Sequence, residues 1–170
     1  MISIAAAKTL TEWSERTLWR RISDGTLARI DDNTFEDKAK ICLDSIKPYI
    51  CVSLGPEDFD LIESADAGNA EAQTDLALIF LANAKSESAI YWLKLAAKQD
   101  YAEAMHWIGR CYTDGNELPK NESLGIMWIA KAAAQCHVIS QGQMQAIIDK
   151  ITGKDSLEFC TNRGEMGVSD

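Results

Sequence analysis

Histidine and cysteine side chains are the first candidates for metal binding or catalysis in this sequence. The two histidines, His106 and His137, have Cys111 and Cys136 nearby in the chain. No recurring ligand spacing links them, and such a spacing is what identifies a zinc site in a sequence. His106 lies in a segment with helical periodicity and can face the inner surface of a helical array. We therefore predict no metal site and interpret both histidines as structural.

Common enzyme motifs are also missing from the sequence. It contains no glycine-rich phosphate loop and no nucleophile motif. Glu71 and Glu103 occupy equivalent places in two related segments, so they indicate a repeated structural feature rather than a catalytic pair. We predict a non-enzymatic protein that needs no cofactor.

The cysteines and the apolar composition indicate a cytoplasmic protein with a packed core. Five scattered cysteines form no CxxC pair: Cys42, Cys51, Cys111, Cys136 and Cys160. Their odd number and wide spacing favour reduced, structural thiols. Hydrophobic residues make up 46% of the chain, yet no apolar run is long enough to cross a bilayer. The opening MISIAAAKTLTEW lacks the pattern of a signal peptide, and we expect no membrane association.

Basic residues gather near the amino end of this acidic chain. Residues 1–30 hold five basic and three acidic residues, a net charge of +2, whereas the whole chain carries −9. Arg16 and Arg20 are four residues apart and therefore share a helical face. Basic side chains neutralise phosphates, which makes this face a candidate DNA surface. The candidate contacts are Ser14, Arg16, Thr17, Arg20 and Arg21. The alternative is a module that docks onto a protein or onto the rest of the chain, with the arginines solvated.

The elements that would position these arginines follow from periodicity and capping residues. Apolar spacing predicts one helix over 3–10 and a second helix that begins after Ser14, with Leu18, Trp19 and Ile22 facing inward. Ser14 can cap the second helix, and Asp24-Gly25 can end it. A two-stranded ribbon is predicted over 27–30 and 38–43, followed by a short helix that Asp44 can cap.

The stretch SERTLWRRISDGTL resembles the winged helix-turn-helix of the MerR and excisionase-like families. The residues that carry this resemblance are Ser14, Thr17, Leu18, Arg20, Ile22, Gly25 and Leu27. It implies that the helix after Ser14 enters the major groove and that the ribbon acts as the wing. Two features depart from the pattern: Glu12 stands where glycine is frequent, and the acidic ribbon over 31–37 would repel phosphates.

Two related segments occupy the chain between Ala65 and Gln135. The stretch GNAEA at 68–72 corresponds to DYAEA at 100–104, and Trp92 corresponds to Trp128. The first offset is 32 residues and the second is 36, because the loop within the second copy is longer. Repeated helical hairpins of this kind predict a stacked array, whose usual role is to bind another macromolecule.

The copies resemble the Sel-1-like repeat, a relative of the tetratricopeptide repeat. The second copy fits well through Ala102, Ala104, Ile108, Gly109, Tyr112, Gly115, Trp128, Lys131, Ala132 and Ala133. In the first copy, Ala77 replaces the glycine, Phe80 replaces the tyrosine, and the turn lacks glycine. Helices over 56–67 and 138–151 are expected to cap the array on either side.

We therefore predict a mostly α-helical chain in which a short hairpin array follows a small winged helix-turn-helix-like domain. The expected parts are the domain at 1–50, a linker at 51–56, the repeats with capping helices at 57–152 and a flexible tail at 153–170. On the array, the candidate protein contacts are Gln73, His106 and Arg110. In the first hypothesis the array binds a protein while the amino-terminal domain contacts DNA, which would favour a homodimer. The alternative is a protein-interaction scaffold with no DNA-binding role.

Overall fold

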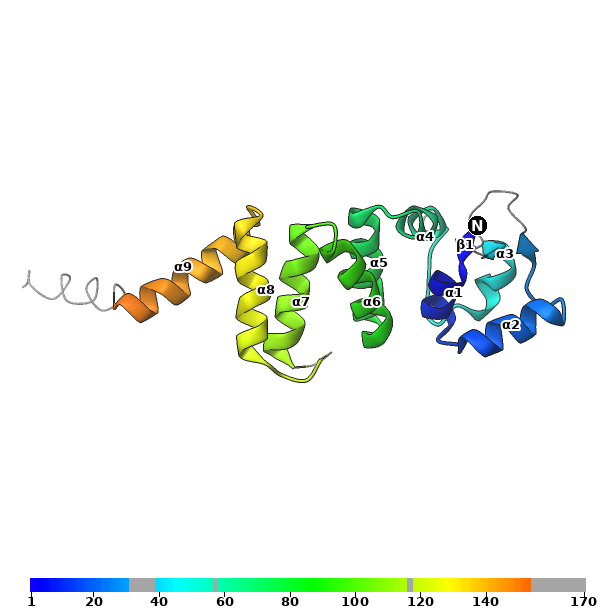
Figure 1. The fold of residues 1–170 in the computed structure, drawn as a ribbon, viewed down its shortest axis with the longest axis horizontal. Helices are drawn as coiled ribbons and strands as arrows, with labels where there is room; N and C mark the ends of the chain where they lie inside the picture. The colour runs from blue at the N-terminus through cyan, green and yellow to red at the C-terminus, as the bar shows by residue number, and fades with distance from the viewer. Residues whose placement is uncertain (31–38, 57, 116–117, 154–170) are drawn as a thin grey trace, which may run out of the picture.

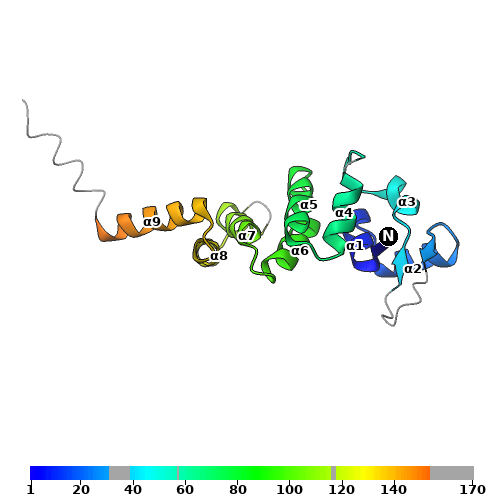
Figure 2. The same ribbon diagram turned by 90° about the horizontal axis from the view of Figure 1, so that it is seen from above.

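The protein is an elongated helical molecule, seen here in a computed structural model that describes residues 1–30, 39–56, 58–115 and 118–153. The amino-terminal elements lie together at one end, and the helices from α4 to α9 follow one another along the long axis (Figures 1 and 2). In chain order they are β1 (Ile2–Ser3), α1 (Ile4–Thr11), α2 (Glu15–Ser23), β2 (Arg29–Ile30), β3 (Lys40–Ile41), α3 (Leu43–Ile46), the 3-10 helix η1 (Lys47–Tyr49), α4 (Asp58–Asp66), α5 (Ala70–Ala82), α6 (Ser86–Ala97), α7 (Ala102–Asp114), α8 (Glu122–Ala134) and α9 (Val138–Thr152). None of the described helices is both long and apolar enough to cross a membrane.

The amino-terminal module, residues 1–30 and 39–56, combines two capped helices with a small antiparallel sheet. Ser14 accepts a hydrogen bond from the backbone amide of Thr17 and so starts α2, while Gly25 follows its end with a φ of +78°. The strand order is β1-β3-β2, with Ile41 opposite both Ile2 and Arg29. Strand β1 was not predicted, because Ile2–Ser3 forms a strand only by pairing with β3, which is far away in the chain.

Two details of this module differ from the sequence predictions. Cys42, not Asp44, precedes the short helix α3, and the Asp44 carboxylate accepts instead from Lys47 at 2.6 Å. Trp19 does not face inward, since 38% of it is exposed on the flank of α2. The predicted ribbon turn at 31–38 lies outside the described residues.

Two helical hairpins, α5–α6 and α7–α8, form the centre of the molecule and stack side by side (Figure 1). Asn69 and Asn121 cap α5 and α8 through their side-chain oxygens. Gly109 lets α7 approach α8 closely, because an added Cβ there would lie 2.7 Å from Cγ1 of Ile129. In the first hairpin the corresponding residue is Ala77, which is fully buried, so that hairpin accommodates a side chain at the same place.

A single hydrophobic core runs from the amino-terminal module into the repeats. Helix α1 packs against α6, and the hydroxyl of Ser88 donates to the carbonyl of Thr9 at 2.8 Å. The indole Nε1 of Trp92 donates to the hydroxyl of Thr9 at 3.1 Å, and both of these bonds are buried. Ser3 adds hydrogen bonds from its amide and hydroxyl to the carboxylate of Asp66 beside α4. The module therefore closes the amino end of the helical array.

The carboxyl end of the array is finished differently, by α9. This helix was predicted to close the array, and its first turn does pack against α7 and α8, where Ser140 is fully buried. Beyond that turn α9 runs away from α8 (Figures 1 and 2), so Ile151 is left 79% exposed. The predicted tail, apart from Gly153, lies outside the described residues.

Candidate interaction surfaces

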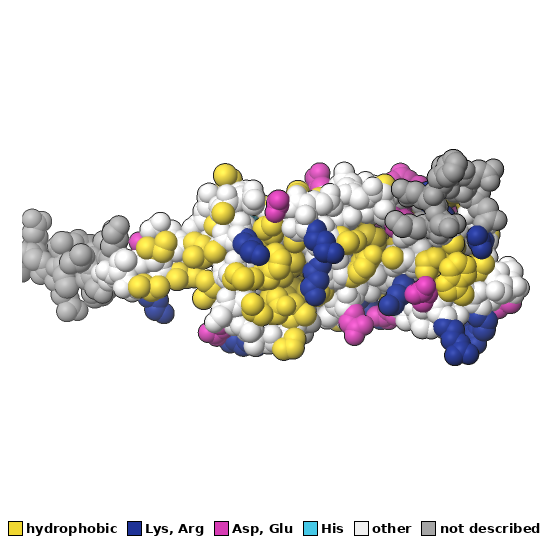
Figure 3. All heavy atoms as spheres, in the orientation of Figure 1, with side chains coloured by type: hydrophobic (Ala, Val, Ile, Leu, Met, Phe, Trp, Pro, Cys, Tyr) yellow, Lys and Arg dark blue, Asp and Glu magenta, His cyan; other side chains and the backbone are white. Residues whose placement is uncertain are grey.

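The outer face of α2 presents two arginines to solvent. Arg16 and Arg20 are both exposed, and dark blue side chains gather along this helix in Figure 3. The first turn of α2 is fixed by Ser14, whose hydroxyl lies 2.9 Å from that of Thr17 as well as 3.2 Å from its amide. Ser14 and Thr17 therefore serve the cap of α2, while Arg16 and Arg20 offer positive charge.

Arg21, a predicted DNA contact, is instead part of the packing of the module. Its guanidinium carbon lies 4.4 Å from the ring centroid of Trp13 and 5.1 Å from that of Tyr49. Its Nε is buried and has no hydrogen-bond partner. A cation placed against aromatic rings in this way holds α2 onto η1. Arg21 therefore packs within the module, and its role as a DNA contact stays a prediction; the spacing of arginines along α2 did not reveal this stacking.

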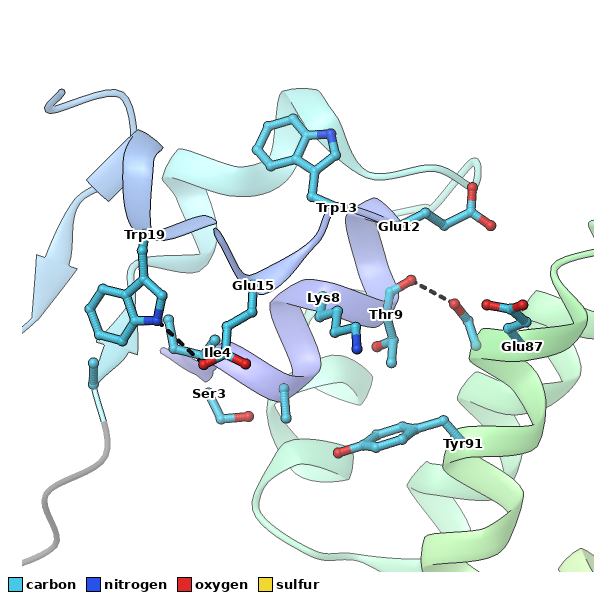
Figure 4. Close-up of a pocket in the computed structure, with 13 residues that line it drawn as sticks. Ser3, Ile4, Lys8, Thr9, Glu12, Trp13, Glu15, Trp19, Glu87 and Tyr91 are labelled. Atoms are coloured by element: carbon cyan, nitrogen blue, oxygen red, sulfur yellow. Dashed lines mark hydrogen bonds between the residues drawn. The ribbon is translucent and has the colours of Figure 1, made fainter. Parts of the chain in front are cut away.

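A groove of about 650 Å³ lies where α1, α2 and α6 meet (Figure 4). Its floor is the exposed side of α1, with Ala5 and Lys8. Trp19 stands on the α2 side of the groove and Tyr91 on the α6 side (Figure 4). Burial, with a smaller effect from the charge of Asp66, raises the pKa of Tyr91, so its hydroxyl remains a hydrogen-bond donor at neutral pH.

Charged side chains of both signs surround this groove. Lys8 lies near its centre and Glu87 at its α6 edge, as Figure 4 shows. Glu12 accepts from Lys85 at 2.6 Å, and Glu15 accepts from the indole of Trp19 at 3.4 Å. Three aromatic rings, one amine and three carboxylates thus line the groove between the three helices. The sequence did not reveal this site because its walls are about 70 residues apart in the chain.

Of the three predicted protein contacts on the array, two are buried. Gln73 is 4% exposed, and its side chain donates to the carbonyl of Ala65 and accepts from Gln99. His106 is also 4% exposed. These two residues hold helices together and do not offer a surface, so their prediction as contacts is wrong. Arg110 is exposed, and its guanidinium carbon lies 4.9 Å from the ring centroid of Trp107.

His106 belongs to a hydrogen-bonded cluster at the start of α9. Nδ1 of His106 and Nδ1 of His137 each lie 2.9 Å from the hydroxyl of Ser140, and the two imidazole rings are 4.5 Å apart. Nε2 of His137 donates to Glu103 at 2.8 Å, which leaves Nδ1 free to accept from the amide of Ser140. Burial, and then the neighbouring His137, lowers the pKa of His106, so His106 is neutral at pH 7.

This cluster links a hydroxyl, an imidazole and a carboxylate, yet it does not have the geometry of a nucleophilic site. Ser140 is fully buried, and its hydroxyl is shared between two histidine rings. A reacting hydroxyl needs room for substrate and one base aligned to take its proton. The cluster instead caps α9 and ties it to α7. No signal in the sequence marks Ser140, because only the packing of α9 brings it between the histidines.

The comparisons with known proteins agree with the helical hairpins. Residues 70–101 and 102–135 each match the family model of the Sel1 repeat. No curated protein matches the sequence. The crystal structure of a Sel1 repeat protein from Oxalobacter formigenes is similar at 27% sequence identity, with a TM-score of 0.49. The matched region covers 51% of this chain and 26% of that one, so this chain spans about a quarter of its length. The prediction of Sel-1-like repeats is confirmed over the matched residues, which form the hairpins α5–α6 and α7–α8.

Proposed function

We propose that this protein is a non-enzymatic scaffold that binds an extended segment of a protein partner in the groove between α1, α2 and α6. The observation that carries this proposal is the groove itself, about 650 Å³ in volume and bordered by Trp19 and Tyr91. That volume falls within the range of specific ligand sites, and partly exposed aromatic side chains are typical anchors of protein interfaces. The Sel1 repeats add support, because stacked helical repeats generally bind other macromolecules.

The chemistry of the groove fits a peptide segment. The two rings offer apolar surface, while the amine of Lys8 and the carboxylate of Glu87 can pair with main-chain or charged groups of a partner. Two helices of the amino-terminal module and one helix of the first repeat build this site. We place the protein in the cytoplasm, because it keeps Cys42, Cys51 and Cys136 as accessible or partly accessible free thiols, which suits a reducing compartment.

Site-specific photo-crosslinking in cells tests the groove. A photoreactive amino acid at Glu87 should capture a partner, and Trp19→Ala together with Tyr91→Ala should abolish that capture. Glu71 is the matched control, since it is also an exposed acidic residue in the first turn of a repeat helix but lies on α5. Equal capture from both positions, or capture that survives loss of both rings, would refute the groove as the binding site.

A second candidate function is DNA contact by α2, which Arg16 and Arg20 favour. The order β1-α1-α2-β2-β3, with both helices capped, is compatible with a winged helix-turn-helix module at 1–50, and the exposed arginine pair would face phosphates. The described residues of this surface offer few cations besides this pair. A single such module would bind weakly, so this function would require a homodimer on two half-sites.

Binding to random duplex DNA across a salt series tests this second function. Arg16→Glu with Arg20→Glu should abolish binding, and neutralising the pair should lower the slope of log affinity against log salt by about 2. Lys94→Glu with Lys98→Glu is the matched control, because these exposed lysines are also four residues apart but lie in the last turn and at the C-cap of α6. Negligible binding of the unmodified protein at low salt, or equal losses in both variants, would eliminate DNA contact through α2.

A further inference from the structure

Large apolar side chains are exposed mainly at one end of the described part of the molecule. Apart from Met1 and Trp19, all of them lie on α8 or α9, and Figure 3 shows apolar surface continuing from the repeats onto α9. On α9, helical spacing places Met144, Ile147, Ile148 and Ile151 on one stripe, which we call the carboxyl-terminal apolar face. The other exposed apolar residues of these two helices are Leu124, Ile126, Met127, Val138 and Ile139. Isolated exposed apolar residues are ordinary, but a contiguous group marks an interaction surface.

The direction of α9 explains why this face has no partner within the described chain. The cluster at Ser140 fixes the first turn of α9 against α7 and α8. Helical spacing places Ile147 and Ile151 on the same stripe of α9 as Ser140. This stripe runs from complete burial at Ser140 to 79% exposure at Ile151 as α9 leaves α8 behind (Figure 2). The apolar stripe therefore continues past the helix that it packs against.

The charge of α9 and the covered amino end of the array indicate which partner binds this face. The chain carries −9, yet Asp149 and Lys150 are the charged residues of α9 and cancel each other. Two copies of this face can therefore meet without charge repulsion. Head-to-tail stacking would need an open amino end, and the amino-terminal module covers that end through the bonds of Thr9 with Ser88 and Trp92. The arrangement that remains is a closed dimer in which the same face of each copy meets the other.

We infer that the carboxyl-terminal apolar face binds the same face of a second copy of this chain, related by a two-fold axis. Such a pairing leaves the groove and α2 at the two far ends of the dimer, where both remain accessible (Figure 1). The dimer would thus present two identical binding sites that point away from each other. This inference is independent of what the groove or α2 binds.

Sedimentation of the full chain over a wide concentration range tests the pairing. We expect the mass to rise from the 18.8 kDa of one chain to about twice that value. Ile148→Glu with Ile151→Glu should keep the protein monomeric with unchanged helical circular dichroism, because both side chains are already exposed. If the variant with Ile148→Glu and Ile151→Glu loses helicity, the variant with Ile148→Ala and Ile151→Ala gives the same comparison without added charge.

The matched control places the same two charges on the side of α9 that faces away from the Ile148–Ile151 stripe. Gln143→Glu with Ala146→Glu changes exposed positions of that helix and should leave dimerisation intact. An unmodified chain that is monomeric at every concentration would overturn the inference, and so would equal weakening by both charged pairs. Pairing only after truncation at Gly153 would show that residues 154–170 cover the face, and that result would also contradict it.

Discussion

The two ends of the helical array differ in how they are finished. At the amino end, α1 lies on α6, and Thr9 forms buried hydrogen bonds with Ser88 and Trp92. At the carboxyl end, one cluster around Ser140 holds the first turn of α9, and the rest of that helix exposes apolar residues. A stacked helix needs its apolar side covered, and only the amino end achieves this within the described chain.

This difference separates two kinds of surface. The closed amino end offers a shaped groove and an arginine pair, built on helices that share the core of the repeats. The carboxyl end offers apolar area on α9, which packs against α8 and is exposed beyond its first turn. Recognition of a partner through specific side chains suits the first end, and burial of apolar surface by a second copy suits the other.

The largest effect should follow loss of the side chain that joins the closed end to the repeats. Trp92→Ala removes a side chain that is 1% exposed and also the donor to Thr9, so we expect the free energy of unfolding to fall by about 3–5 kcal/mol. Urea unfolding, followed by circular dichroism and by tryptophan fluorescence, should give coincident transitions. Trp19→Ala, at a more exposed tryptophan, should cost far less. Two separate transitions in the unmodified protein would show that the module and the repeats are independent.

A smaller and local effect is expected at the open end. Ser140→Ala leaves Nδ1 of His106 buried without its partner, a loss of about 1–3 kcal/mol. Because α9 is the last described helix and packs mainly against α8 alone, its amides should lose hydrogen-exchange protection while those of α5 and α6 keep theirs. Equal loss of protection along the whole array would contradict a separately held α9.

Acid should weaken the open end more than the closed end. Both histidines of the chain, His106 and His137, lie in the cluster that holds α9 at the open end. Burial holds the pKa of folded His106 below its ordinary value of about 6.5, so the unfolded chain takes up the proton first. This contribution to stability is present above about pH 6.5 and is lost as the pH falls below that value. Glu103 opposes the shift, while Arg110 and His137 reinforce it.

Hydrogen exchange of α9 at successive pH values measures this effect. Protection of α9 should fall with acid, and protection of α1 should change little. In His106→Gln the additional loss of α9 protection in acid should disappear, because glutamine does not titrate. A pH response of α1 as large as that of α9 would assign the effect to groups other than this cluster.

The smallest effect should come from the exposed ion pair between Glu12 and Lys85, which joins the amino-terminal module to the first repeat. Glu12→Gln removes the carboxylate that accepts from Lys85, yet exposed ion pairs contribute little to stability in water. The midpoint of thermal unfolding should stay within experimental error. A clear drop would show that this pair, and not the buried bonds of Thr9, holds the amino-terminal module in place.

Local sequence signals predicted the helices better than they predicted the surfaces. Ser14 and Gly25 gave the ends of α2, because capping and left-handed backbone depend on neighbouring residues alone. Repetition revealed the hairpins, since corresponding residues recur at nearly constant spacing. The groove could not be predicted, because Trp19 and Tyr91 meet only when α2 and α6 dock onto α1. Gln73 was assigned to a surface because periodicity does not show which polar side chains bond within an array.

Hydrogen exchange of the full chain at low and high protein concentration tests most directly whether one end is closed and the other open to pairing. We predict that amides of α1 exchange with the same free energy as those of α5 and α6 at both concentrations. Amides in the second half of α9 should be weakly protected at low concentration and become protected at high concentration. Faster exchange in α1 than in α5, together with no effect of concentration on α9, would contradict this description of the molecule.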